Sequence, residues 1–178
     1  MNRLLLYAAL LLLTQCSKCK DDPEPRPPVA ETLPAETQTG ANTFGCRLNG
    51  QVWTASPAYF SPTLTADYTG SFGQERLMIM AINDRPPVQQ GTYFRLRGVS
   101  GPGRYPIASG QPCYVEFADD NRTCPLYDTL TSVQAGVVDI TRLDRVQRVV
   151  SGRFSFTLRR AGCPDVQATD GRFDMRLP

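Results

Sequence analysis

The sequence contains no histidine, and its only lysines are Lys18 and Lys20 near the N-terminus. From Gly40 onward every basic residue is an arginine. A nucleophilic serine or cysteine needs a base beside it, usually a histidine or a lysine. The chain beyond Gly40 therefore lacks the residues for Ser–His, Cys–His and Ser–Lys catalytic pairs.

Other catalytic and binding motifs are missing as well. The sequence has no phosphate-binding P-loop, no dinucleotide-binding glycine fingerprint and no zinc-protease helix motif. Its formal net charge of +2 does not predict binding to nucleic acid. One enzymatic alternative remains, glycan hydrolysis by two carboxylates, with Glu75 and Glu116 as the only glutamates after residue 42. We expect neither an enzyme nor a bound cofactor or metal.

The sequence after residue 42 predicts an all-β fold. Its apolar residues form short extended runs that end at glycine, proline or asparagine, and no stretch keeps the period of a helix. The chain of 178 residues has room for one ordinary domain. We expect a single antiparallel β-sandwich or flattened barrel of roughly 8–10 short strands, with few or no helices.

Local patterns predict individual strands. The Asn49-Gly50 pair predicts a hairpin with a two-residue turn, and its apolar face comprises Phe44, Cys46, Leu48, Val52 and Trp53. The continuous apolar run at residues 77–82 predicts a central strand buried on both faces. Residues 136–143 and 148–159 predict a second hairpin.

Two similar segments lie near the C-terminus, at residues 152–158 and 171–177, and both begin with Gly-Arg-Phe. Their period of two predicts neighbouring antiparallel strands that close the core. The side chains expected to point inward are Phe154, Phe156, Leu158, Phe173, Met175 and Leu177.

The N-terminus has the pattern of a secretory signal. Residues 1–15 carry one cation, Arg3, followed by an apolar run too short to span a bilayer. The run ends in the sequence LTQC, which resembles the lipobox of bacterial lipoproteins. This resemblance implies that the Cys16 thiol is lipidated and anchors the chain to a membrane. A plain signal peptide with an incidental Cys16 is the alternative.

The next residues resemble an export signal followed by a tether. Lys20, Asp21 and Asp22 resemble the surface-export signal of Bacteroidota lipoproteins, the alternative being a solvated charge cluster. The resemblance implies an outer-membrane lipoprotein at the cell surface, or else on the periplasmic face. Residues 16–41 are rich in proline and poor in apolar residues, which predicts a disordered tether before a domain at residues 42–178.

The domain contains four cysteines, which are Cys46, Cys113, Cys124 and Cys163. In an exported domain, disulfides are the expected state, and no C-x-x-C pair among these four favours zinc. We prefer Cys113–Cys124 and Cys46–Cys163. The other connectivities and reduced, buried thiols remain open.

The run TFGCRLNGQVW at residues 43–53 resembles the opening of a family of small Bacteroidota lipoproteins of unknown function. The segments SGRFSF at residues 151–156 and TDGRFD at residues 169–174 are similar to the closing strands of that family. The resemblance implies an envelope location and a β fold, but no activity and no site residues.

Four features are candidate binding or modification sites, each with a structural alternative. The aromatic residues Trp53, Tyr59, Phe60 and Tyr68 would stack on a sugar or else pack in the core. An outward face with Arg153, Arg159, Arg172 and Arg176, interrupted by Asp174, would meet an acidic glycan or protein or else be an ordinary sheet face. Calcium would be bound by Asp119, Asp120, Asn121 and Asp128, the alternative being a solvated turn.

The fourth feature is Thr129. The segment at residues 128–130 resembles the O-glycosylation acceptor of Bacteroidota proteins.

These observations lead to one expectation about function. The chain is expected to be an envelope lipoprotein whose domain is a non-catalytic binding or accessory module for a protein or a glycan. The alternative is a structural or protective envelope component without a diffusible ligand.

Overall fold

A computed structural model describes residues 32–178 except 57–61, 71–73, 86, 88 and 121. The predicted signal peptide, Cys16 and the export signal at residues 20–22 lie outside the described residues, as do Tyr59 and Phe60. The described residues form strands, turns and loops without any helix, so none of them forms a helix that would cross a membrane.

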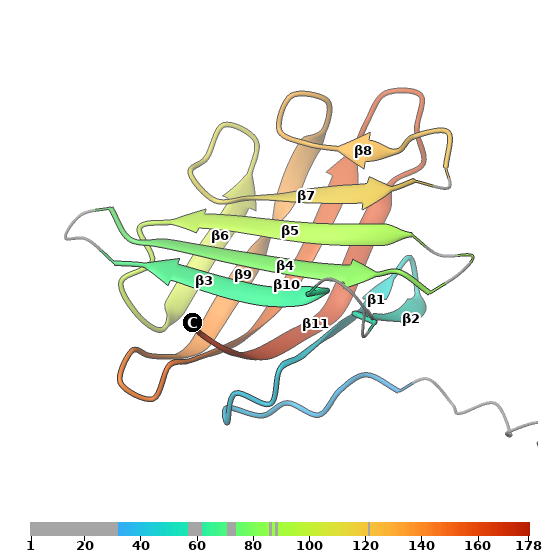
Figure 1. The fold of residues 1–178 in the computed structure, drawn as a ribbon. Helices are drawn as coiled ribbons and strands as arrows, with labels where there is room; N and C mark the ends of the chain where they lie inside the picture. Colours follow the sequence, from blue (N-terminus) through green and yellow to red (C-terminus); the bar gives the residue numbers. More distant parts are fainter. Residues whose placement is uncertain (1–31, 57–61, 71–73, 86, 88, 121) are drawn as a thin grey trace, which may run out of the picture. The chain divides into compact units, whose positions relative to one another are not determined.

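The fold is an antiparallel β-sandwich, as the sequence predicts. Sheet A has six strands in the order β2-β1-β11-β10-β9-β6, and sheet B has five in the order β3-β4-β5-β7-β8. Strands of the two sheets cross at a steep angle, and neither sheet closes into a barrel (Figure 1). The strands of sheet A are β1 (Thr43–Leu48), β2 (Gln51–Thr54), β6 (Gly103–Ala108), β9 (Val133–Asp144), β10 (Val149–Arg159) and β11 (Val166–Arg176). Those of sheet B are β3 (Leu64–Thr69), β4 (Arg76–Asn83), β5 (Gln90–Arg97), β7 (Tyr114–Asp119) and β8 (Leu126–Tyr127).

The first hairpin is confirmed. Asn49 and Gly50 have φ values of 49° and 83°, which match a two-residue turn with both central residues at positive φ. Its strands β1 and β2 bury Phe44, Cys46, Leu48 and Trp53. Val52 is only half-buried, because it precedes Trp53 on the same strand and consecutive side chains point to opposite faces.

The two similar C-terminal segments are neighbours, as expected. Strands β10 and β11 pair antiparallel, and all six side chains predicted to point inward are buried. The second predicted hairpin is also confirmed, since β9 and β10 pair across the turn after Asp144.

The expectation for residues 77–82 is wrong in one respect. Strand β4 is central in sheet B, but its side chains alternate, with Leu77, Ile79 and Ala81 buried and Met78 41% exposed. Nothing in the described chain covers the outer face of this strand, so the outward methionines contact solvent although the sequence run is apolar throughout. An apolar run alone does not show whether one or both faces of a sheet are covered.

Aromatic rings fill the space between the sheets. Phe154 of β10 lies 4.9 Å from Phe44 of β1 and 4.9 Å from Phe94 of β5, measured between ring centroids. Phe156 lies 5.8 Å from Phe94. Because Phe94 belongs to sheet B and the other rings to sheet A, this cluster joins the two layers.

The preferred disulfide pairing is wrong. The structure contains a Cys124–Cys163 bond, with a Cα–Cα distance of 6.0 Å, and leaves Cys46 and Cys113 as buried thiols. Cys124 follows β7 and Cys163 lies in the turn between β10 and β11, and these two loops meet at one end of the sandwich. A hydrogen bond of 2.7 Å from the Tyr127 hydroxyl to the Pro164 carbonyl joins β8 to the turn between β10 and β11 at the same end.

Candidate functional site

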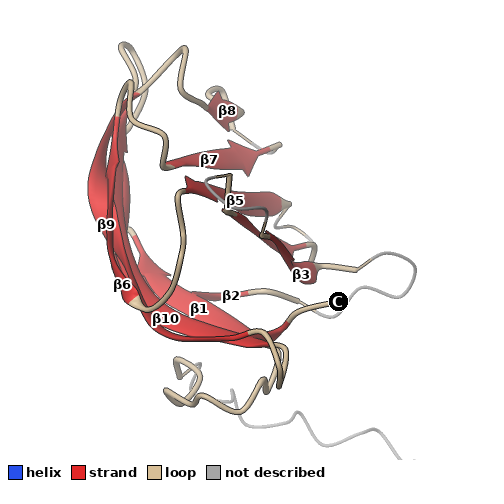
Figure 2. Cartoon of the chain, turned by 90° about the vertical axis from the view of Figure 1, so that its left-hand side faces the viewer, coloured by secondary structure: helices blue, strands red, loops and turns tan. Residues whose placement is uncertain are grey.

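Residues 34–41, here called the strap, run along the outer face of sheet A (Figure 2). Pro34 lies so close to Gly45 of β1 that a Cβ atom at Gly45 would be 2.6 Å from the Pro34 Cδ. The expected tether therefore differs from the structure over these residues, because this part of the chain has specific partners in the sheet. The compact unit begins at Thr32 rather than at residue 42.

The strap is fastened by one carboxylate, that of Asp174 in β11. Asp174 accepts hydrogen bonds from three backbone N–H groups and three hydroxyls, with distances of 2.6–3.3 Å. The donors are the hydroxyls of Thr37, Thr39 and Ser151 and the N–H groups of Thr39, Gly40 and Ala41. The sequence predicts that Asp174 interrupts an outward face of arginines. In the structure Asp174 is only 1% exposed, so its side chain does not lie open among those arginines.

The environment of Asp174 favours its charged form. Burial alone would raise the pKa of this carboxyl, but hydrogen bonds from the Thr37 and Ser151 hydroxyls and from the strap backbone outweigh burial. The net result is a pKa well below the usual range of an aspartate.

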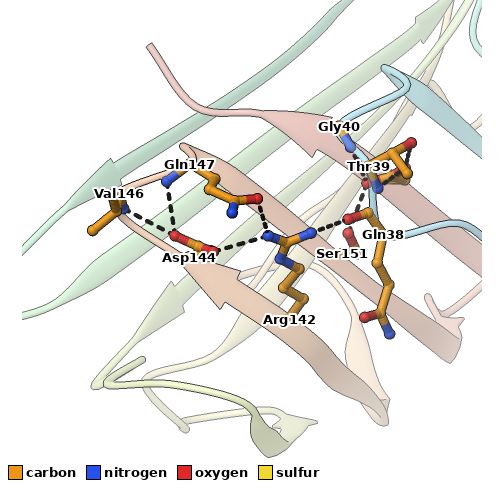
Figure 3. Close-up of polar contacts among 9 residues, drawn as sticks. Gln38, Thr39, Gly40, Arg142, Asp144, Val146, Gln147 and Ser151 are labelled. Atoms are coloured by element: carbon orange, nitrogen blue, oxygen red, sulfur yellow. Dashed lines mark hydrogen bonds and ion pairs between the residues drawn. The ribbon is translucent and has the colours of Figure 1, made fainter.

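Arg142 of β9 makes a second attachment (Figure 3). Its Nη1 donates to the Gln38 carbonyl of the strap, and its Nη2 donates to Asp144 at 2.8 Å and to Gln147 at 2.5 Å. Asp144 also accepts from the backbone N–H groups of Val146 and Gln147, which closes the β9–β10 turn. The strap and this turn are therefore held by the same arginine.

The predicted arginine face exists in part. Arg153 and Arg172 are directly opposite each other on β10 and β11, and we call them the arginine pair. Arg176 instead donates to the Gly40 carbonyl of the strap at 3.3 Å, and Arg159 forms an exposed ion pair with Asp165. Only Arg153 and Arg172 share a hollow, whose volume is about 460 Å³.

The predicted sugar platform is not formed by Trp53 and Tyr68. Trp53 is 5% exposed, and its indole N–H donates to Gln90 at 2.9 Å. The Tyr68 hydroxyl donates to the Val99 carbonyl, and the Arg145 guanidinium lies 4.9 Å from the centre of its ring. The alternative of core packing therefore holds for Trp53, and Tyr68 has its own intramolecular partners.

The structure does not support the calcium site. The Asp119 side chain is 3% exposed, accepts from Gln90 at 2.7 Å and forms an ion pair with Arg122 at 2.7 Å. Asp128 accepts from the N–H groups of Leu130 and Thr131 in its own turn. In the described part of the chain no group of three or more acidic or cysteine side chains is placed to hold a metal ion.

Thr129 and the two glutamates also have defined places. Thr129 is exposed in the turn that follows Asp128. Glu116 of β7 faces outward beside Tyr93 and forms an ion pair with Arg95 at 3.6 Å. Glu75 lies at the other end of sheet B, about 16 Å away along the strand direction by register, which exceeds the spacing of a glycosidase pair.

The outer face of sheet B holds residues that the sequence reasoning did not single out. Met80 of β4 is directly opposite Tyr93 of β5, and Met78 is opposite Arg95. These side chains line a largely apolar hollow of about 280 Å³. The alternation of side chains within residues 92–99 could have identified Tyr93. Because Phe94 and Leu96 point inward, Tyr93 must point outward.

Tyr93 covers a glycine of its own strand. A Cβ atom built at Gly91 would lie 2.8 Å from the Tyr93 ring, so the ring rests over the bare backbone. The Tyr93 ring thus fills the place that a side chain at position 91 would take on the outer face.

The outer faces of the two sheets therefore differ in kind. That of sheet A is polar and carries the strap, whereas that of sheet B offers Met78, Met80 and Tyr93. Comparisons of the chain with protein-family models, with curated proteins and with solved structures found no match.

Proposed function

We propose that this protein is an exported, lipid-anchored module of the cell envelope that binds a protein partner through the outer face of sheet B. The lipobox ending at Cys16 and the resemblance of both ends of the domain to small Bacteroidota lipoproteins support the envelope location. Lys20, Asp21 and Asp22 favour the cell surface over the periplasmic face of the outer membrane.

The observation that carries the binding role is the outward row of Met78, Met80 and Tyr93 on sheet B, over which no described segment lies. Methionine, tyrosine and arginine are enriched in protein–protein interfaces, and methionine adapts its shape to a partner. Arg95 and Glu116 flank the row and supply polar groups at its edge. The methionines beside Tyr93 favour a protein partner over a glycan, because glycans bind by stacking on aromatic platforms rather than on flexible thioether side chains.

A non-catalytic role is consistent with the chemistry available. The chain beyond Gly40 has neither histidine nor lysine, and the two domain glutamates lie far apart in register. Binding needs only a shaped surface, and we assign that role to the outer face of sheet B.

Capture from envelope extracts tests the role of this face. The full protein would be compared with a Met78→Ser/Tyr93→Ser variant and with Val133→Ser, a matched change at an exposed apolar residue of β9. We expect the wild type and Val133→Ser to retain the same protein and the double variant to lose it. Equal retention by all three would contradict the proposal, and retention of a glycan alone would favour the glycan alternative.

Protease treatment of intact cells tests the location. We expect protease to remove the domain while a periplasmic marker stays intact, and a Cys16→Ala variant to lose its membrane attachment. Protection of the domain until the outer membrane is opened would place it on the periplasmic face.

A further inference from the structure

The arginine pair of sheet A is unusual for an exposed sheet face. Arg153 and Arg172 are direct cross-strand partners, and like charges in that position destabilise a sheet. Asp139 of β9 is opposite Arg153 on its other side, so it offsets only part of the charge. Arg172 donates to the carbonyl oxygens of Pro34 and Asp170, both at 3.3 Å, so its guanidinium is held beside that of Arg153.

A carboxylate from the strap already binds Arg153 of this pair. Arg153 donates from Nε and Nη2 to one oxygen of Glu36, at 2.9 and 2.5 Å. The hydrogen bond from Arg153 holds the pKa of Glu36 below its usual value. The forked guanidinium is thus oriented to receive a carboxylate.

The contact with Glu36 is easily exchanged. The Arg153 and Glu36 side chains are 62% and 44% exposed, and exposed ion pairs of this kind contribute little stability. The strap does not depend on Glu36, because Asp174 and Arg142 hold residues 37–41. Glu36 can therefore leave the arginine pair while the strap stays in place.

The hollow beside the pair has room for a small ligand. Its volume of about 460 Å³ lies within the range of small-molecule sites, and it is lined by Glu36, Val137, Asp139, Arg153, Asp170 and Arg172, among others. Asp139 and Asp170, the latter in an exposed ion pair with Arg47 at 3.5 Å, would accept hydrogen bonds from hydroxyl groups. Asp139 would also disfavour a second negative charge on the ligand. A ligand with one carboxylate and several hydroxyls fits this set of groups.

We propose that this hollow is a binding site for a carboxylate-bearing sugar, and that Glu36 occupies the carboxylate position when the sugar is absent. The sugar carboxylate replaces Glu36 on Arg153, and its hydroxyls donate to Asp139 and Asp170. The site lies on sheet A and is independent of the protein-binding face of sheet B.

Titration of the full protein with glucuronate, followed by nuclear magnetic resonance of the arginine Nε–H groups, tests this site. We expect saturable shifts at Arg153 and Arg172 with glucuronate and none with glucose. Glu36→Gln removes the internal competitor and is expected to tighten glucuronate binding about two- to fivefold. Arg153→Gln is expected to weaken it about tenfold, and Arg172→Gln replaces that variant if it does not fold.

Arg159→Gln is the matched control, because Arg159 is exposed on the same strand and pairs with Asp165 outside the hollow. It is expected to bind glucuronate as the wild type does. The proposal is overturned if glucose shifts the same groups, if Arg153→Gln binds equally well, or if neither the wild type nor Glu36→Gln saturates. None of these outcomes would affect the capture experiment on sheet B.

Discussion

At the scale of single residues, Asp174 decides how the N-terminal part of the domain is held. Its carboxylate receives six hydrogen-bond donors, and five of them come from the strap. Removing the charge leaves several of these donors without an acceptor in a buried place, which costs more than the loss of one ordinary hydrogen bond.

The Asp174→Asn variant is expected to lower the free energy of unfolding by about 3 kcal/mol. Ser151→Ala, which removes a single donor to the same carboxylate, is expected to cost about 1 kcal/mol. Urea unfolding of both variants and the wild type measures these differences. Equal, small effects would show that the strap is not fastened at Asp174.

The same residue predicts a pH dependence. Because its pKa is lowered in the folded protein, Asp174 contributes stability at pH values above the usual aspartate pKa, about 3.9, and loses it as the pH falls through the folded pKa. The stability difference between the wild type and Asp174→Asn should stay constant from neutral pH down to about pH 4 and narrow in stronger acid. A difference that disappears already near pH 5 would contradict the assigned hydrogen bonds.

At the scale of strands, the sequence predicts what is local and misses what depends on distant partners. The Asn49-Gly50 hairpin and the paired strands at residues 152–158 and 171–177 follow from turn chemistry and period two. The exposed face of β4 was missed, because a run of six apolar residues carries no information about which face is covered. The order of strands in the sheets also depends on contacts far apart in sequence.

Strands β9 and β10 approach closely at Gly136. A Cβ atom there would lie 2.4 Å from the Ser155 carbonyl oxygen and 2.8 Å from the Phe156 Cα. Backbone atoms cannot move aside without disturbing the pairing of the two strands, so Gly136→Ala is expected to cost about 3 kcal/mol in unfolding free energy. Thermal or urea unfolding measures this cost.

Gly101→Ala is the matched control for that variant. A Cβ atom at Gly101 would have no neighbour within 4 Å, so the change is expected to alter stability by less than about 0.5 kcal/mol. Similar stability of the two variants would contradict the close approach of β9 and β10.

At the scale of the whole molecule, long-range contacts set the features that the sequence reasoning got wrong. The disulfide and the strap join residues separated by 39 and by more than 130 positions. Cysteine spacing alone favours a disulfide that closes a short loop. The fold instead brings together Cys124, from the loop between β7 and β8 of sheet B, and Cys163, from the turn between β10 and β11 of sheet A. The strap has the composition of a tether, and its partners, Asp174 and Arg142 among them, are brought to it only by the folded sheet.

The disulfide makes a direct prediction. A non-reducing peptide digest should contain a linked pair with Cys124 and Cys163, and Cys124→Ser/Cys163→Ser should lower the unfolding free energy by about 4 kcal/mol. The Cys46 thiol should not react with maleimide in the folded protein, because burial raises its pKa to about 12. A linked Cys113–Cys124 peptide would show that the described pairing is wrong.

The central claim is that the outer face of sheet B binds a partner in the cell envelope. Hydroxyl-radical footprinting tests it by comparing oxidation of Met78, Met80 and Tyr93 in cells that produce the protein with oxidation of the purified protein. Val133 and Leu130, which are 64% and 93% exposed, serve as reference positions. We expect the three residues of sheet B to be protected in cells while the reference positions react equally in both samples. Equal oxidation of Met78, Met80 and Tyr93 in cells and in the purified protein would contradict it.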